Sequence, residues 1–147
     1  MTTTPERTLH RTSAQSASEP GRVWVGGGER TLPVVAPPAL GGGDGGPAWQ
    51  PEQLYAAALA SCLHQTLGVV ASEVGGADLA DSRVTADVAL THDGSLRYGF
   101  TTRVTVDVPR VDAGTRRMLL RELMRTCPVA GQVELAEGAE GAEGAEG

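Results

Sequence analysis

The chain has 147 residues, of which 40% are hydrophobic but only 3% aromatic, and its formal net charge is −6. This length suits one domain with an aliphatic core, and the acidic balance argues against nucleic acid or an anionic membrane surface as a partner. The chain shows neither an apolar N-terminal leader nor an apolar run of about 18 residues without polar breaks. We therefore expect a cytoplasmic protein that binds no membrane.

The N-terminal part contains short, mostly polar strand signals. Residues 1–6 are expected to fray, and residues 7–18 to form an edge strand, because threonine, serine and alanine alternate there. Residues 22–25 and 31–36 predict a hairpin joined by three glycines. Residues 37–49 contain prolines and a glycine-rich run that no regular element tolerates, so we expect a loop.

The next segment, Pro51–Ser72, predicts one long helix. Proline suits its first position, and Glu52 lies beside the positive end of the helix dipole. Its alanine, leucine and valine residues surround the axis almost completely, which is typical of a helix buried on all sides. The many small side chains would let other backbones approach closely.

The C-terminal half predicts a strand pair and a second helix. Apolar residues alternate through 84–90 and 96–108, with a turn at His92–Ser95 between them. Asp112 is expected to cap a helix over 113–126, whose apolar side would comprise Met118, Leu119, Leu123 and Met124. Cys127-Pro128 should end this helix, because a residue before proline is pushed out of the α region.

The chain ends in a low-complexity segment. Residues 133–135 could add a short strand. The sequence then repeats Ala-Glu-Gly as far as Gly147. Such an acidic repeat cannot bury enough apolar surface to fold, so residues 136–147 are expected to be a disordered, solubilising tail. The sequence thus predicts a frayed end at 1–6, one domain over 7–135, and this tail.

The residues able to carry chemistry are two cysteines, three histidines, Glu52 and the arginines. Cys62 and His64 are two positions apart on the predicted helix, about 200° around its axis, so they cannot share a metal or act as a nucleophile–base pair. We expect no metal and no bound cofactor. A histidine brought in by folding, or a thiol pair of Cys62 with Cys127, remains open, and so does an interaction protein with inert buried cysteines.

The string Pro51-Glu52-Gln53-Leu54-Tyr55, followed by Ala60-Ser61-Cys62, resembles the signature of the Ohr/OsmC family of organic hydroperoxide resistance and osmotically inducible proteins. The preceding Leu40-Gly41-Gly42 loop, the strand pair after the helix, and Cys127-Pro128 at the corresponding distance are similar too. The resemblance covers roughly residues 8–135. It implies an α+β fold in which two copies intertwine as a homodimer, with antiparallel sheets wrapped around long central helices.

The resemblance also implies an activity and its residues. The family reduces organic hydroperoxides with a thiol and is re-reduced by a dithiol such as a lipoyl group on a partner protein. By motif position, Cys62 would be the peroxidatic thiol, Cys127 the resolving thiol, and Glu52 the carboxylate that organises the site. The alternative is a protein of the same fold, with weak or no peroxidase activity, that binds a hydrophobic small molecule.

The arginine that contacts the reactive thiol in this family has no direct counterpart. Its place holds Glu19, and only the second arginine of the family's turn matches, as Arg22. A thiol buried among alanine and leucine needs a nearby cation to ionise, and we expect Arg22, bridged to Glu52, to supply it. If Arg22 is instead a solvated residue at the start of its strand, then Arg7, Arg11 or an arginine of the second helix would have to supply the charge. Glu52 precedes Cys62 by ten residues, about 15 Å along a continuous helix, so an antiparallel partner chain would have to supply it.

Overall fold

The computed structural model describes residues 4–17, 21–28, 30–42 and 46–136. Packing divides the chain into two compact units, one ending at Pro51 and the other beginning at Glu52. Residues 4–6 are exposed and have no regular structure. The expected tail lies outside the described residues, apart from Ala136, and the limits of the expected domain remain a prediction.

The N-terminal unit is a three-stranded antiparallel sheet. Its strands are β1 (Ala14–Ser16), β2 (Arg22–Val25) and β3 (Arg30–Pro33), in that order, and a short 3-10 turn follows at Pro38–Leu40. Gly26, Gly27 and Gly28 all have positive φ in the turn between β2 and β3, where other residues would be strained. None of the described side chains of this unit is buried, so the sheet has no core of its own.

The sequence located the hairpin correctly but overestimated the first strand. Strand β1 has three residues instead of the twelve expected for 7–18, and Leu9 is 82% exposed. The segment pairs with β2 only where Ala14 faces Val25 and Ser16 faces Val23. A strand needs a partner and an apolar face, and most of this segment offers neither.

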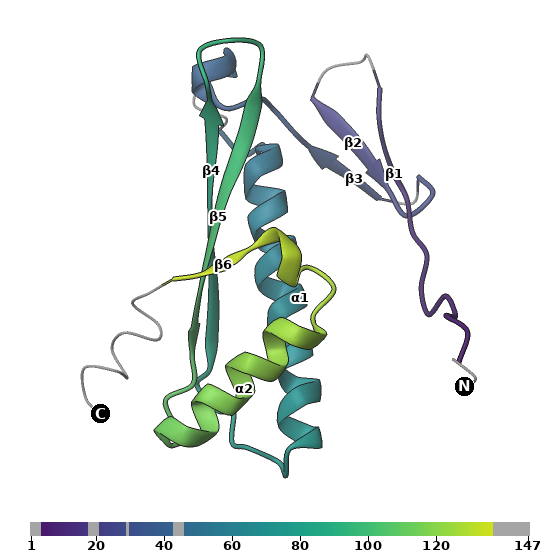
Figure 1. Ribbon diagram of the computed structural model, residues 1–147. Helices are drawn as coiled ribbons and strands as arrows, with labels where there is room; N and C mark the ends of the chain where they lie inside the picture. The colour runs from purple at the N-terminus through teal and green to yellow at the C-terminus, as the bar shows by residue number, and fades with distance from the viewer. Residues whose placement is uncertain (1–3, 18–20, 29, 43–45, 137–147) are drawn as a thin grey trace. The chain divides into compact units, whose positions relative to one another are not determined.

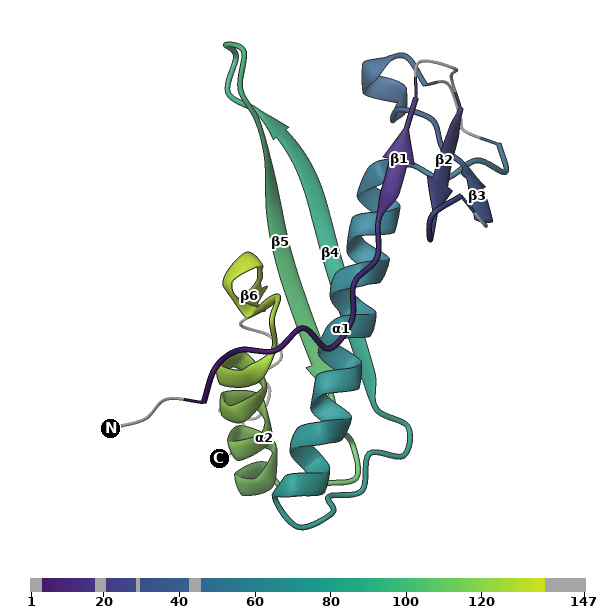
Figure 2. The ribbon, with the colours of Figure 1, turned by 90° about the vertical axis from the view of Figure 1, so that its right-hand side faces the viewer.

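The second unit carries two helices on a three-stranded sheet (Figures 1 and 2). Its elements, in chain order, are α1 (Pro51–Glu73), β4 (Arg83–His92), β5 (Tyr98–Asp107), α2 (Ala113–Thr126), a 3-10 turn (Ala130–Gln132) and β6 (Glu134–Leu135). The strand order is β4-β5-β6, with β4 antiparallel and β6 parallel to β5. The predicted helices, strand pair and short last strand are therefore confirmed.

One hydrophobic core joins these elements. Both helices pack on the sheet face that presents Val104 and Val106 of β5, together with Val108 just after the strand. The remaining buried members come from α1 (Leu63, Leu67, Val70, Ala71) and from the second helix and its end (Leu119, Leu120, Leu123, Cys127). Each fully buried leucine contributes about 1.5–3 kcal/mol relative to exposure. This core fixes the middle of α1 against the end of α2.

Helix α2 begins where the sequence indicates, but its buried face differs. The Asp112 side chain accepts a hydrogen bond from the Thr115 backbone N–H at 2.7 Å, which confirms the predicted cap. Met118, expected on the apolar side, is 38% exposed, whereas Leu120 is buried. The five large apolar residues of this helix spread over more than one face, and only packing in the folded core selects among them.

Helix α1 is not buried all round, contrary to expectation. Its buried residues fall on one face, from Leu59 to Ala71, while the opposite side exposes a stripe of mostly small side chains: Ala57, Ala58, Ser61, Gln65, Gly68 and Val69. Among the described helices, α1 alone is long and apolar enough to cross a membrane. Because one face packs in the core, these features also suit a core helix that lacks a partner on its other face.

The far half of the β4–β5 ribbon is exposed as well. The hairpin tip projects beyond the N-terminal end of α1 (Figures 1 and 2). The apolar alternation predicted for residues 96–108 leads to burial only at Val104, Val106 and Val108, whereas Tyr98 and Phe100 are 58% and 48% exposed. The described residues of α1 and α2 leave both rings about half exposed, although the Tyr55 ring of α1 stacks on Phe100.

Candidate redox site

The two cysteines meet in the folded chain. The Sγ atoms of Cys62 and Cys127 lie 3.9 Å apart, and both thiols are free. Cys62 comes from the middle of α1 and is half-buried, whereas Cys127 caps the C-terminus of α2 and is 5% exposed. A disulfide requires about 2.05 Å between sulfurs, so the two sulfur atoms would have to approach each other by about 2 Å to form one.

Local structure places Cys127 firmly. Its backbone N–H donates to the Leu123 carbonyl at 2.9 Å, while its own backbone is extended, as expected before Pro128. On α1, the Thr66 hydroxyl donates to the Cys62 carbonyl at 3.0 Å. The backbone of each cysteine is thus fixed by helical hydrogen bonds: Cys62 lies within α1, and Cys127 lies at the C-terminal end of α2.

The surroundings of Cys62 disfavour its ionisation. Burial raises the pKa of the Cys62 thiol, and the hydrogen bond and charge of Cys127 raise it further. This agrees with the expectation for a thiol among aliphatic side chains. A nucleophilic thiolate at neutral pH therefore requires a cation beyond this thiol pair.

Glu52 lies on the same helix as Cys62 but cannot touch it. Helix α1 runs without interruption from Pro51 to Glu73, so the two residues are about 15 Å apart along its axis. The Oε2 atom of Glu52 is buried, and none of the described residues gives it a hydrogen bond. A buried carboxylate oxygen without a partner is costly, about 1–3 kcal/mol or more, so this position calls for a donor from elsewhere.

An aromatic pair beside Glu52 was not anticipated. Tyr55 lies one helical turn after Glu52, and its ring stacks on Phe100 of β5, with centroids 5.1 Å apart. This contact fastens the first turns of α1 to the sheet. Tyr55 belongs to the motif at the start of the predicted helix, and Phe100 belongs to the predicted alternating strand. No feature of the amino-acid sequence indicates that the two side chains make contact.

His64 faces away from the thiols. Its Nε2 atom lies 2.9 Å from the Ser82 hydroxyl, whereas Cys62 faces Cys127. The predicted angular separation of Cys62 and His64 on the helix is therefore confirmed. Within the described ranges, no three histidine, cysteine or acidic side chains come together as metal ligands.

Arg22 belongs to the N-terminal unit, on β2. Its Nη1 atom donates to the Thr31 hydroxyl of β3 at 2.9 Å, and the residue is exposed. Its expected bridge to Glu52 remains a prediction, and Glu19 lies outside the described residues. Among the other candidate cations, Arg116 donates to the Val106 carbonyl and Arg125 pairs with Glu122.

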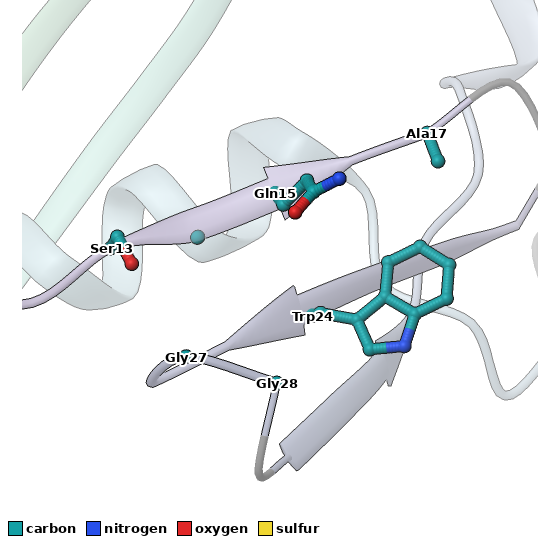
Figure 3. Close-up of a pocket in the computed structure, with 7 residues that line it drawn as sticks. Ser13, Gln15, Ala17, Trp24, Gly27 and Gly28 are labelled. Carbon is teal, nitrogen blue, oxygen red and sulfur yellow. The ribbon is translucent and has the colours of Figure 1, made fainter.

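A hollow of about 340 Å³ lies on the N-terminal sheet. Figure 3 shows Trp24 of β2 together with Ser13, Gln15 and Ala17 of the first strand segment and the turn glycines Gly27 and Gly28. Among the described residues that line it, there is no cysteine, acid, base or histidine. These residues offer an aromatic face, small side chains and backbone groups, and none of them supplies a group for redox or acid–base chemistry.

A family model described as OsmC-like protein matches residues 41–136, which include both thiols and Glu52. The chain belongs to the OsmC-like family. No curated protein sequence matches it. The match covers the whole second unit that the structure describes, together with the loop before it.

Solved structures of OsmC-like proteins share this fold. An organic hydroperoxide resistance protein, OsmC, from Legionella pneumophila is 23% identical, with a TM-score of 0.76 over 88% of this chain and 96% of its own. A Vibrio cholerae structure assigned to organic hydroperoxide resistance, with captopril in one of its active sites, is 25% identical, with a TM-score of 0.75 over 88% and 90%. OhrB of Bacillus subtilis is 23% identical, with a TM-score of 0.69 over 87% and 96%. These structures confirm the expected α+β OsmC-like fold.

Proposed function

We propose that this OsmC-like protein is a cytoplasmic peroxidase that reduces organic hydroperoxides with Cys62 and Cys127. The observation that carries the proposal is the 3.9 Å contact between their sulfurs. Inert buried cysteines need no thiol neighbour, and a pair from two separate helices suits a reversible disulfide. The organic hydroperoxide resistance proteins among the solved relatives support the same assignment.

The proposed reaction has two steps on the protein. The Cys62 thiolate attacks one peroxide oxygen, an S–O bond forms, the O–O bond breaks, and the leaving alkoxide takes a proton to become an alcohol. Cys62 is then a sulfenic acid, two electrons more oxidised. The Cys127 sulfur attacks the Cys62 sulfur, the S–S bond forms, and the hydroxyl leaves as water after taking the Cys127 proton.

A dithiol reductant completes the cycle. It attacks the disulfide, passes through a mixed disulfide, and leaves as a cyclic disulfide while both protein thiols are restored. We expect a lipoyl group, on a partner protein or as a small molecule, to serve as this co-substrate, without any bound cofactor. A dithiol suits the site because its second thiol releases the mixed disulfide without another molecule having to enter.

The environment of Cys62 favours an apolar substrate. Cys62 packs against the aliphatic cluster of α1, α2 and β5. Each substrate methylene buried there contributes about 0.8 kcal/mol, or about fourfold in binding, which hydrogen peroxide cannot gain. The proposed substrates are therefore alkyl and lipid hydroperoxides.

We further propose that the active unit is a homodimer with shared sites. Among the described residues, three surfaces remain exposed: the stripe of α1 opposite its buried face, the far half of the β4–β5 ribbon, and the N-terminal sheet, none of whose side chains is buried. The orphaned Oε2 of Glu52 needs a donor that the described residues do not provide. An antiparallel copy would bring Glu52 of one chain toward Cys62 of the other, with Arg22 between them as activating cation.

Steady-state turnover tests the assignment. The purified chain is mixed with cumene hydroperoxide or hydrogen peroxide, and with dihydrolipoamide or glutathione as reductant. The proposal predicts turnover that prefers the organic peroxide and the dithiol by about tenfold or more, the equivalent of 1.4 kcal/mol. Loss of turnover in Cys62→Ser, with retained turnover in Ser61→Ala next to it, attributes the activity to Cys62. Absence of turnover with every combination of peroxide and reductant would reject the proposed peroxidase activity. It would favour a protein of the same fold that binds a hydrophobic small molecule.

A further inference from the structure

The second helix concentrates positive charge on its exposed side. Four of the twelve basic residues of the chain lie on α2, with only Glu122 as an acid. Arg117, Arg121 and Arg125 follow at intervals of four residues, so they share one helix face, about 6 Å apart along the axis. All three are exposed.

A hollow of about 230 Å³ runs along this face. Two arginines and three apolar residues line it: Arg117, Leu120, Arg121, Met124 and Leu135. Four of them belong to α2, and the fifth belongs to β6. The lining therefore pairs guanidinium groups with a short apolar floor, which suits an acidic peptide that also carries small apolar side chains.

The chain itself delivers such a peptide to this place. Leu135 is the last residue of β6, and the Ala136 N–H donates to the Val104 carbonyl at 2.8 Å, so the backbone is fixed as far as the rim of the hollow. The next residues are the Ala-Glu-Gly repeat, with Glu137, Glu140, Glu143 and Glu146. Eleven residues span up to about 36 Å when extended, which exceeds the whole length of α2.

We propose that the Ala-Glu-Gly tail docks on the arginine face of α2, with its alanines over the apolar floor and its glutamates on Arg117 and Arg121. The tether places the tail at an effective concentration in the millimolar range, so even weak contacts are occupied. Exposed ion pairs are individually weak and are screened by salt. The docked tail is therefore held loosely, and an acidic partner protein would have to displace it to use this face.

NMR relaxation of the 15N-labelled full chain tests the proposal. In about 0.01 M salt, where the Debye length is about 30 Å, the amides of Glu137 and Glu140 should have order parameters above about 0.6. They should fall below that value in about 1 M salt, where the Debye length is about 3 Å. Substituting all four tail glutamates by glutamine should shift the Nε–Hε signals of Arg117 and Arg121.

Matched arginine variants separate docking from general attraction. Arg117→Gln with Arg121→Gln should free the tail at low salt, whereas Arg83→Gln with Arg97→Gln, which removes the same charge from exposed sites elsewhere, should leave it docked. Order parameters below about 0.6 in the unmodified chain at low salt would overturn the proposal. So would equal release of the tail in both double variants.

Discussion

The sulfurs of Cys62 and Cys127 lie 3.9 Å apart although 65 residues separate them in the sequence. The contact depends on two independent features: the leucine face of α1 that packs against α2, and the Cys-Pro step that ends α2 at this point. The two sulfur atoms are therefore already neighbours when one of the thiols is oxidised. Cys62 is the more exposed of the two, which suits its proposed role of meeting the peroxide, and the burial of Cys127 suits its proposed role as the resolving thiol.

Removal of the resolving thiol should leave a single turnover. In Cys127→Ser, Cys62 is oxidised to a sulfenic acid that nothing converts to a disulfide, so excess peroxide should drive it to the sulfinic acid. Intact mass spectrometry would then find two added oxygen atoms on the variant, whereas the unmodified chain loses two hydrogens. Equal residual turnover in Cys127→Ser and Cys62→Ser would contradict the assignment of roles.

Mixed dimers test whether Glu52 acts across the interface. Glu52→Ala and Cys62→Ser chains are each expected to be inactive, but their heterodimer holds one intact shared site. Random exchange should therefore restore about a quarter of full activity. The matched control mixes Glu52→Ala with a chain carrying both substitutions, which leaves no intact site. Lack of rescue after verified exchange would place Glu52 outside a shared site.

Cys62 alkylation measured against pH tests the activating cation. Burial and Cys127 raise the Cys62 pKa in the single chain, so without a cation the alkylation rate should rise only above the ordinary value of about 8.5. If Arg22 activates the thiol, a chain with Cys127→Ser should titrate below that value, and Arg22→Met should move the titration upward. At neutral pH each pKa unit lowers the thiolate fraction about tenfold.

Arg30→Met provides the control for this titration, since Arg30 is an exposed arginine on the neighbouring strand β3. Arg22→Lys should restore part of the lowered pKa, because it keeps the charge. Identical titrations with and without Arg22 would assign the cation to another residue. A high pKa in every chain would favour the ligand-binding alternative.

Core substitutions should show that the packing of α1 against α2 contributes to the free energy of unfolding. Leu63, next to Cys62, is fully buried, so Leu63→Ala should lower the free energy of unfolding by about 2–5 kcal/mol. Leu9, 82% exposed and outside any regular element, should cost within about 0.5 kcal/mol when changed to alanine. Urea unfolding at one fixed protein concentration measures both, and similar losses would contradict the described core.

Local signals in the sequence predicted most of this unit. Asp112 and the Cys127-Pro128 step gave the limits of α2, because caps and proline restrictions act within a few residues. Nonlocal packing was harder to predict. Nothing near Met118 or Leu120 indicates which of them faces α1, and the apolar surface of α1 gave no sign that one stripe stays open within the chain.

The candidate site was predictable only in part, for the same reason. The motif around Cys62 and the Cys-Pro step suggested a thiol pair through family resemblance, whereas helix geometry alone separated Glu52 from Cys62. The stacking of Tyr55 on Phe100 joins residues 45 positions apart, and no local pattern encodes it. The cation needed by Cys62 would have to come from outside the thiol pair. The order of residues along the chain does not indicate which residue supplies it.

One stoichiometric experiment tests the central claim most directly. Reduced protein is mixed rapidly with one equivalent of cumene hydroperoxide, free thiols are counted, and the product is mapped by peptide mass spectrometry without reduction. The account predicts that two thiols disappear for each hydroperoxide consumed, with one new disulfide joining Cys62 to Cys127 within the chain. Unchanged thiols, or a product in which Cys62 and Cys127 are not joined, would contradict it.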